Sequence, residues 1–167
     1  ASKMNVEKDI LVLFLTSHGS QGSLSVNFSR APLNNLKAED LAAILEASGI
    51  KHRVIIISAC YSGSFIPALS NENTAVLTAA SAKSVSFGCS NEREWTYFGD
   101  ALINRALRET HSFADAFGTA KTLISEWEQK DKLTPSEPQI SMGAAIAAKL
   151  DKLARDLENS VHKVHLE

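Results

Sequence analysis

Two short, uninterrupted apolar runs constrain the fold of this 167-residue chain more than any other feature. They read ILVLFLT at Ile10–Thr16 and VIIIS at Val54–Ser58. Runs of this length, without polar alternation, are typical of strands that are buried on both faces of a largely parallel sheet. Both runs fall far short of the roughly 18 apolar residues of a membrane-spanning helix, so we expect no membrane span in this chain.

Helical patterns separate these runs and the later strand candidates. Further strands are predicted at Ala75–Ala79, Val85–Ser90 and Gln139–Gly143, and helices at Ala38–Ser48, Tyr97–Arg108, Ser112–Gln129 and Ala144–Val161. Alternating strands and helices indicate an α/β sandwich with a mostly parallel sheet. The length suits a single domain, which we assign to residues 1–165. Residues 166–167 are interpreted as a cloning remnant.

The composition excludes several classes of protein. Hydrophobic residues make up 44% of the chain and charged residues 22%, values that are ordinary for a folded globular protein. The formal net charge is −2 and no basic stripe stands out, so a nucleic-acid partner is not expected. The chain has two cysteines, Cys60 and Cys89, which are too few for a disulfide framework.

Each of the two apolar runs leads into a residue that can carry chemistry. His18 and Gly19 follow the first run, and Cys60 follows the second, 42 residues after His18. Because sites in open α/β sheets form at the carboxyl ends of the strands, neighbouring parallel strands would bring His18 and Cys60 to one edge. An imidazole beside a thiol favours the thiolate and can protonate a leaving amine. A buried cysteine and a loop histidine are nevertheless often structural residues, and the spacing alone leaves that alternative open.

Several stretches together resemble the bacterial branch of the legumain-like cysteine peptidases, within the caspase–gingipain superfamily. They are LFLTSHGS at Leu13–Ser20, IIISACYSGSF at Ile55–Phe65, the blocks Thr74–Ser90 and Trp95–Leu102, and Ser-Glu-Pro-Gln at Ser136–Gln139. The resemblance implies a caspase-like three-layer sandwich. It also implies a cysteine endopeptidase that works through a thioester acyl-enzyme, on peptide or protein substrates and without a metal or organic cofactor.

The resemblance also assigns roles to individual residues. His18 matches the catalytic base, Cys60 the nucleophile and Gly19 the oxyanion-hole glycine. The segment Val85, Ser86 and Phe87 matches the strand beside which substrate lies extended, and Asp100 matches an acidic residue of the primary specificity pocket. Ser58 and Ser86 are expected to shape that pocket as well. Without the resemblance, Asp100 is typical of an acid in the first turn of a helix.

Three departures from the family pattern limit what the resemblance implies. Ser58 stands where legumain has a pocket glutamate, and Ser17 stands where legumain has an aspartate before the histidine. The aspartate missing at Ser17 puts any ligase chemistry tied to it in question. The preference at P1, the substrate residue before the cut, is open between asparagine and another polar residue, because the glutamate at Ser58 and a pocket arginine from the family's first strand and helix are both missing. The family's first strand and helix have no counterpart in the residues before Ile10. We therefore expect an unpaired sheet edge, with either a homodimer through that edge or loose order there.

Two alternatives to a peptidase remain. One is a non-catalytic interaction module that keeps the fold, and the other is a transamidase in which an amine replaces water at the acyl-enzyme. The residues do not reveal a compartment. Resemblance to the bacterial branch, whose members are often associated with the envelope, points to the bacterial cell envelope or periplasm.

Overall fold

The computed structural model describes residues 3–27, 33–89 and 93–164, the last five of them by their backbone alone. Its centre is a four-stranded sheet in the order β1-β5-β6-β7, formed by Ile10–Thr16, His52–Ser58, Thr74–Thr78 and Gln139–Met142. β1, β5 and β6 are parallel, and β7 is antiparallel to β6. The interpreted cloning remnant at 166–167 lies outside the described residues.

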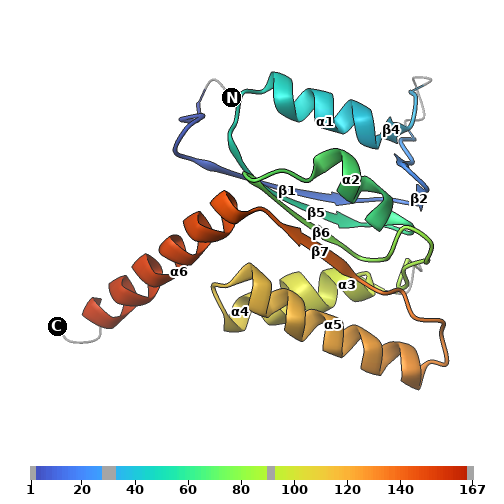
Figure 1. The fold of residues 1–167 in the computed structure, drawn as a ribbon. Helices are drawn as coiled ribbons and strands as arrows, with labels where there is room; N and C mark the ends of the chain where they lie inside the picture. Colours follow the sequence, from blue (N-terminus) through green and yellow to red (C-terminus); the bar gives the residue numbers. More distant parts are fainter. Residues whose placement is uncertain (1–2, 28–32, 90–92, 165–167) are drawn as a thin grey trace.

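Helices cover both faces of this sheet, as Figure 1 shows. One face carries α1 (Ala38–Ala47) and α2 (Ile66–Leu69), the latter preceded by the 3-10 turn η1 (Ser62–Phe65). The opposite face carries α5 (Phe113–Lys130) and a helix that runs through α3 (Tyr97–Gly99), the π-helical segment η2 (Asp100–Ala106) and α4 (Leu107–Glu109). The last helix, α6 (Ala144–Val164), leaves the end of β7 and projects from the body. The arrangement is the three-layer α/β sandwich that the sequence predicts.

A second, smaller sheet lies beyond the end of β1. It has the antiparallel order β2-β3-β4, formed by Gly19–Ser20, Ser23–Leu24 and Leu36–Lys37. The backbone N–H of Ser25 donates to the carbonyl of His18 at 2.8 Å, and the Ser17 hydroxyl donates to the carbonyl of Ser25 at 2.6 Å. These bonds hold the turn that follows β1.

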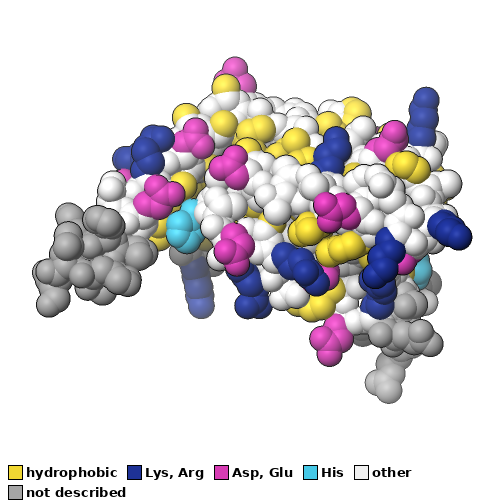
Figure 2. All heavy atoms as spheres, turned by 90° about the horizontal axis from the view of Figure 1, so that it is seen from below, with side chains coloured by type: hydrophobic (Ala, Val, Ile, Leu, Met, Phe, Trp, Pro, Cys, Tyr) yellow, Lys and Arg dark blue, Asp and Glu magenta, His cyan; other side chains and the backbone are white. Residues whose placement is uncertain are grey.

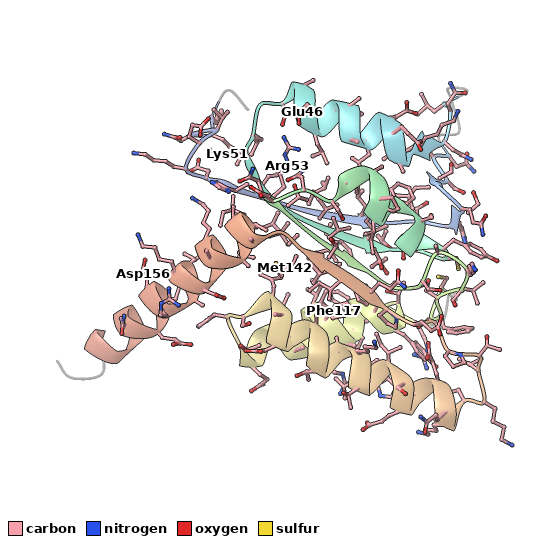
Figure 3. The ribbon with its side chains drawn as sticks, in the orientation of Figure 1. Glu46, Lys51, Arg53, Phe117, Met142 and Asp156 are labelled. Atoms are coloured by element: carbon pink, nitrogen blue, oxygen red, sulfur yellow. The ribbon has the colours of Figure 1, made fainter. Side chains whose placement is uncertain are left out.

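Side chains alternate between the two cores on either side of the sheet. Ile55, Ile57 and Val76 pack with α1 and α2, whereas Val54 and Ile56 pack with the helices of the other face. Phe117 of α5 is buried in that second core, and Figure 3 shows it beneath the sheet, on the same side as Met142 of β7. α5 begins where the Ser112 hydroxyl accepts a hydrogen bond from the backbone N–H of Asp115, so Ser112 is the N-cap of this helix.

Two local predictions are wrong. The run Ile10–Thr16 is not buried on both faces: β1 is the outermost strand of the described sheet, and Val12 and Phe14 are exposed. Val85–Cys89, predicted as a strand with Ser90, forms no ladder and is an irregular loop, while Ser90 itself lies outside the described residues. Its polar backbone groups bond elsewhere: the carbonyl of Phe87 accepts the N–H of Tyr97, and the N–H of Ser86 points to a thiol.

Charged side chains of both signs are mixed on the face that α5 presents. Figure 2 views this face, with Lys and Arg interspersed among Asp and Glu. A mixed distribution of this kind gives the face no strong single-sign field. Among the described residues, no helix is long and apolar enough to cross a membrane.

Candidate active site

The register of β1 on β5 brings the two predicted reactive residues to the same level. Thr16 pairs with Ser58, and the N–H of Ser17 bonds to the carbonyl of Ser58 at 3.4 Å. His18 and Cys60 each follow two residues after this last pair, at the carboxyl edge of the sheet. The His18 side chain is exposed and Cys60 is half-buried. Parallel pairing thus joins two residues that are far apart in the chain at one edge.

Gly19 lies directly against the backbone of Cys60. A Cβ atom placed on Gly19 would overlap the carbonyl oxygen of Cys60, and it would come within 3.1 Å of the Ala59 Cβ. Only glycine allows this approach of the two loops. The contact places the backbone of the His18 turn next to the residue predicted as nucleophile.

A strained turn follows Cys60. Tyr61 has φ of 57°, in the left-handed region that non-glycine residues disfavour. The turn is held on both sides, because the Tyr61 N–H donates to the carbonyl of Ser84 at 2.9 Å and the Ser64 hydroxyl donates to the carbonyl of Tyr61 at 2.5 Å. The Ser64 hydroxyl also accepts the N–H of Gly22 at 2.8 Å, which ties the two turns together. Strain that the surroundings maintain in this way is frequent at functional sites.

Ser86 is the residue that contacts the Cys60 thiol. Its backbone N–H lies 3.3 Å from the Cys60 Sγ, its hydroxyl 3.8 Å, and its carbonyl oxygen accepts from the thiol at 3.6 Å. Val85 and Phe87 flank Ser86 in the same half-buried loop. The resemblance implies that Val85–Phe87 is a substrate-binding segment, and in the structure its central residue, Ser86, contacts the sulfur of Cys60.

A pocket of about 290 Å³ opens beside His18. It is lined by Thr16, Ser17, His18, Gly88, Cys89, Arg93, Glu94, Trp95 and Thr96. Most of its lining residues are polar, one of them positive and one negative, and the Arg93 guanidinium lies 4.6 Å from the centre of the Tyr97 ring. The pocket therefore offers hydrogen-bonding groups to a polar side chain.

None of the three predicted pocket residues, Ser58, Ser86 and Asp100, forms part of this lining. The Ser58 side chain is 2% exposed, and its Oγ lies 2.8 Å from the Thr96 Oγ1. Thr96 in turn accepts the N–H of Gly99 and caps α3. The Asp100 carboxylate accepts from the Asn104 amide at 2.8 Å and pairs with the Arg105 guanidinium at 3.2 Å. Ser58 thus reaches the pocket through Thr96, whereas Asp100 bonds to its own helix.

The sequence analysis assigns no role to several of the lining residues, namely Thr16, Gly88, Arg93, Glu94 and Thr96. Of these, Thr96 places its hydroxyl against that of Ser58, a predicted pocket residue. Its position one residue before a predicted helix suggests an N-cap, which is the only available signal. That the same hydroxyl would meet Ser58 of a strand 38 residues earlier is a tertiary contact. A linear pattern does not encode such a contact.

Both cysteines are free thiols. Desolvation, followed by repulsion from Cys60, raises the pKa of the Cys89 thiol above its ordinary value. A hydrogen bond to the Asp131 carboxylate, followed by burial, raises the pKa of Tyr97. Within the described residues, no group of three or more His, Cys, Asp and Glu side chains is placed to hold a metal ion.

Comparisons with known proteins bear on the family and the fold of this chain. The model of the peptidase C13 family matches residues 3–148. No curated protein gives a significant match. Among solved structures, the crystal structure of caspase-1 from Spodoptera frugiperda superposes with a TM-score of 0.59 at 16% sequence identity, over 81% of this chain and 60% of the caspase chain. The fold is therefore caspase-like, and the chain spans about three-fifths of the caspase that it matches.

Proposed function

The chain belongs to the peptidase C13 family, the legumain family, and from this premise we propose that it is a cysteine endopeptidase with a His18/Cys60 dyad. One observation carries the proposal: the β1–β5 register sets His18 level with Cys60, with Gly19 against the Cys60 backbone. Family membership supplies the reaction class, and this juxtaposition supplies the residues.

In the proposed mechanism, His18 takes the thiol proton of Cys60, and the Cys60 Sγ attacks the carbonyl carbon of the scissile peptide bond. Backbone N–H groups of Gly19 and Cys60 stabilise the negative charge that forms on the carbonyl oxygen. His18 then gives its proton to the departing amine, which leaves a thioester on Cys60. Water, deprotonated by His18, hydrolyses the thioester and regenerates the thiol.

The substrate would lie extended along Val85, Ser86 and Phe87. In this mode of binding, main-chain hydrogen bonds supply affinity and pockets for the side chains supply specificity. The contact between Ser86 and the Cys60 sulfur supports this placement, because a backbone bound there has its carbonyl group next to the nucleophile.

The pocket beside His18 is proposed to receive the P1 side chain. Hydroxyl groups of Ser17 and Thr96 and the charges of Arg93 and Glu94 favour asparagine or another polar residue. Ser58 would shape this pocket through Thr96. Asp100 would act through the helix that Thr96 caps.

A cleavage map tests the proposal. The protein is incubated with a diverse peptide library beside Cys60→Ala and His18→Ala, with the exposed His111→Ala as the control, and new termini are read by mass spectrometry. We expect cuts with wild type and His111→Ala, none with Cys60→Ala and few or none with His18→Ala, and polar residues at P1. Cleavage that survives in Cys60→Ala would contradict the assignment of the nucleophile.

Two alternatives keep the same fold. A transamidase would use the same dyad and yield ligated products when an amine nucleophile is added to the cleavage reaction. A non-catalytic interaction module is favoured by the exposed apolar side chains of Val12 and Phe14 on β1. If the protein is such a module, Cys60 and Cys89 should react with an electrophile at equal rates. If it is a peptidase, Cys60 should react faster than Cys89.

A further inference from the structure

The segment Ser136–Gln139 covers the end of the connection between α5 and β7 and the first residue of β7. It contacts both loops that form the candidate site. The segment contains none of the catalytic or pocket residues described above. One of these loops follows β5 and holds Cys60. The other follows β6 and carries Ser86.

A buried carboxylate anchors this segment to α5. Glu128 is 4% exposed, and its Oε1 accepts the backbone N–H of Ser136 at 3.0 Å. The side chains of Ser136 and Pro138 are buried as well. Because a buried carboxylate needs a hydrogen-bond donor, this bond fixes the segment in place.

The anchored segment binds the loop after β6 at two points. The carbonyl of Ser136 accepts the N–H of Ser81 at 2.9 Å, and the Glu137 carboxylate accepts the Ser84 hydroxyl at 3.3 Å. The Ser81 hydroxyl donates to the Ser84 hydroxyl at 2.9 Å, which closes the network. Ser84 lies two residues before Ser86, and its carbonyl also accepts the N–H of Tyr61.

Gln139 contacts the loop after β5. A Cβ atom on Gly63, three residues after Cys60, would lie 2.6 Å from the Gln139 Oε1 and 2.7 Å from the backbone nitrogen of Ala82. The Gly63 N–H donates to the carbonyl of Ala80 at 2.9 Å. Three segments therefore meet at Gly63 with no room for a side chain.

Glu137 holds its position in a disfavoured backbone conformation. Its φ is 56°, in the left-handed region, and its side chain bonds to Ser84. Lys132, in the same connection, also has φ of 56°, and its N–H donates to the carbonyl of Gln129 in α5 at 3.2 Å. Both residues therefore carry the energetic cost of a left-handed backbone conformation. Of the two, Glu137 is the one whose side chain bonds to the loop that contacts Cys60.

We propose that Ser136–Gln139 is a brace that sets the register of Ser84–Phe87 against Cys60, with Glu137 as its positioning residue. This inference rests on the proposed peptidase function for its effect on substrate binding. Glu137 itself touches no reacting atom. It acts through Ser84 on the segment along which substrate would lie.

The test compares Glu137→Ala with Glu137→Gln, which keeps an acceptor for the Ser84 hydroxyl, and with Lys132→Ala, which has the same backbone conformation. Activity is expressed per titrated active site. For Glu137→Ala we expect KM for a peptide substrate to rise about three- to tenfold, the size of one lost hydrogen bond, with kcat changed less than about twofold. The other two variants should stay close to wild type.

Amide hydrogen exchange of residues 81–87 gives a second readout that needs no catalysis. We expect faster exchange in Glu137→Ala and wild-type exchange in Glu137→Gln and Lys132→Ala. If the wild-type protein cleaves nothing, the peptidase proposal fails and this exchange pattern still decides on the brace. Unchanged exchange, an unchanged KM in an active enzyme, or equal effects of Glu137→Gln and Glu137→Ala would overturn the brace.

Discussion

β1 and β5 are neighbouring strands of equal length and similar apolar character, yet their side chains differ greatly in how far they are buried. β5 lies between β1 and β6, and all of its residues except His52 are buried. β1 is the outermost described strand, and alternate residues along it are exposed. Val12 and Val54 are directly paired across the two strands and show the contrast most sharply, at 54% and 0% exposure.

The difference shows that position in the sheet, and not composition, determines burial. One face of β1 packs through Leu11, Leu13 and Leu15 against the core beneath α1. The other face borders an open pocket of about 610 Å³ that α6 also lines.

At the same end of the sheet, Arg53 anchors β5. Its Nε donates to the carbonyl of Ile50 at 2.6 Å, and its guanidinium lies 3.6 Å from the Glu46 carboxylate. Figure 3 shows Arg53 of β5 below Glu46 of α1.

Substitution of the paired valines tests this contrast with the largest expected effect on the free energy of unfolding. Val54→Ala removes two methyl groups from a fully buried site and should lower the free energy of unfolding by about 2 kcal/mol. Val12→Ala removes the same atoms from an exposed site and should cost less than about 0.5 kcal/mol. Urea unfolding of both variants measures the difference. Equal losses would show that the outer face of β1 is covered in solution.

The open edge of β1 leads to a second prediction. We expect either a homodimer through this edge, observed by sedimentation at increasing concentration, or fast amide exchange along β1. If the dimer forms, Val12→Lys should weaken it by about tenfold or more, because a charge would be desolvated there. Ile44→Lys, at an equally exposed site on α1, is the control. A monomer at every concentration with a fully protected β1 would refute this prediction.

The smallest expected effect concerns pH and the first residue of β5. Burial, followed by the charges of Lys149 and Lys51, lowers the pKa of His52 below 6.5. The folded protein therefore binds fewer protons there than the unfolded chain. The contribution of His52 to stability is complete above about pH 6.5 and is lost as the pH falls below it. His52→Gln should flatten the dependence of stability on pH between about 7 and 5, whereas the exposed His111→Gln should not.

The sequence predicts those features that depend on a short stretch of residues, and it does not predict those that depend on contacts between distant stretches. The two apolar runs, and the reactive residues after them, are local, and so the strands and the positions of His18, Gly19 and Cys60 at one sheet edge could be predicted. The exposure of Val12 depends on what lies outside β1, which no pattern within the run records.

The loop at Val85–Phe87 illustrates the same limit. Its β-branched and aromatic residues favour a strand, but its polar backbone groups bond to Cys60 and Tyr97 instead of a ladder. The contact between Ser58 and Thr96, and the hydrogen bonds from Ser136 to Glu128 and from Ser84 to Glu137, join distant parts of the chain. Only the folded structure reveals such contacts.

The central claim is that His18 activates Cys60, and the rate of thiol alkylation tests it most directly. Iodoacetamide labelling at pH 7, followed by mass spectrometry, gives separate rates for Cys60 and Cys89. Because the pKa of Cys89 is raised, Cys89 should react slowly although it is exposed. We predict that Cys60 reacts at least about tenfold faster than Cys89, and that His18→Ala slows Cys60 and leaves Cys89 unchanged. Equal rates at the two cysteines, or a Cys60 rate indifferent to His18→Ala, would contradict the dyad.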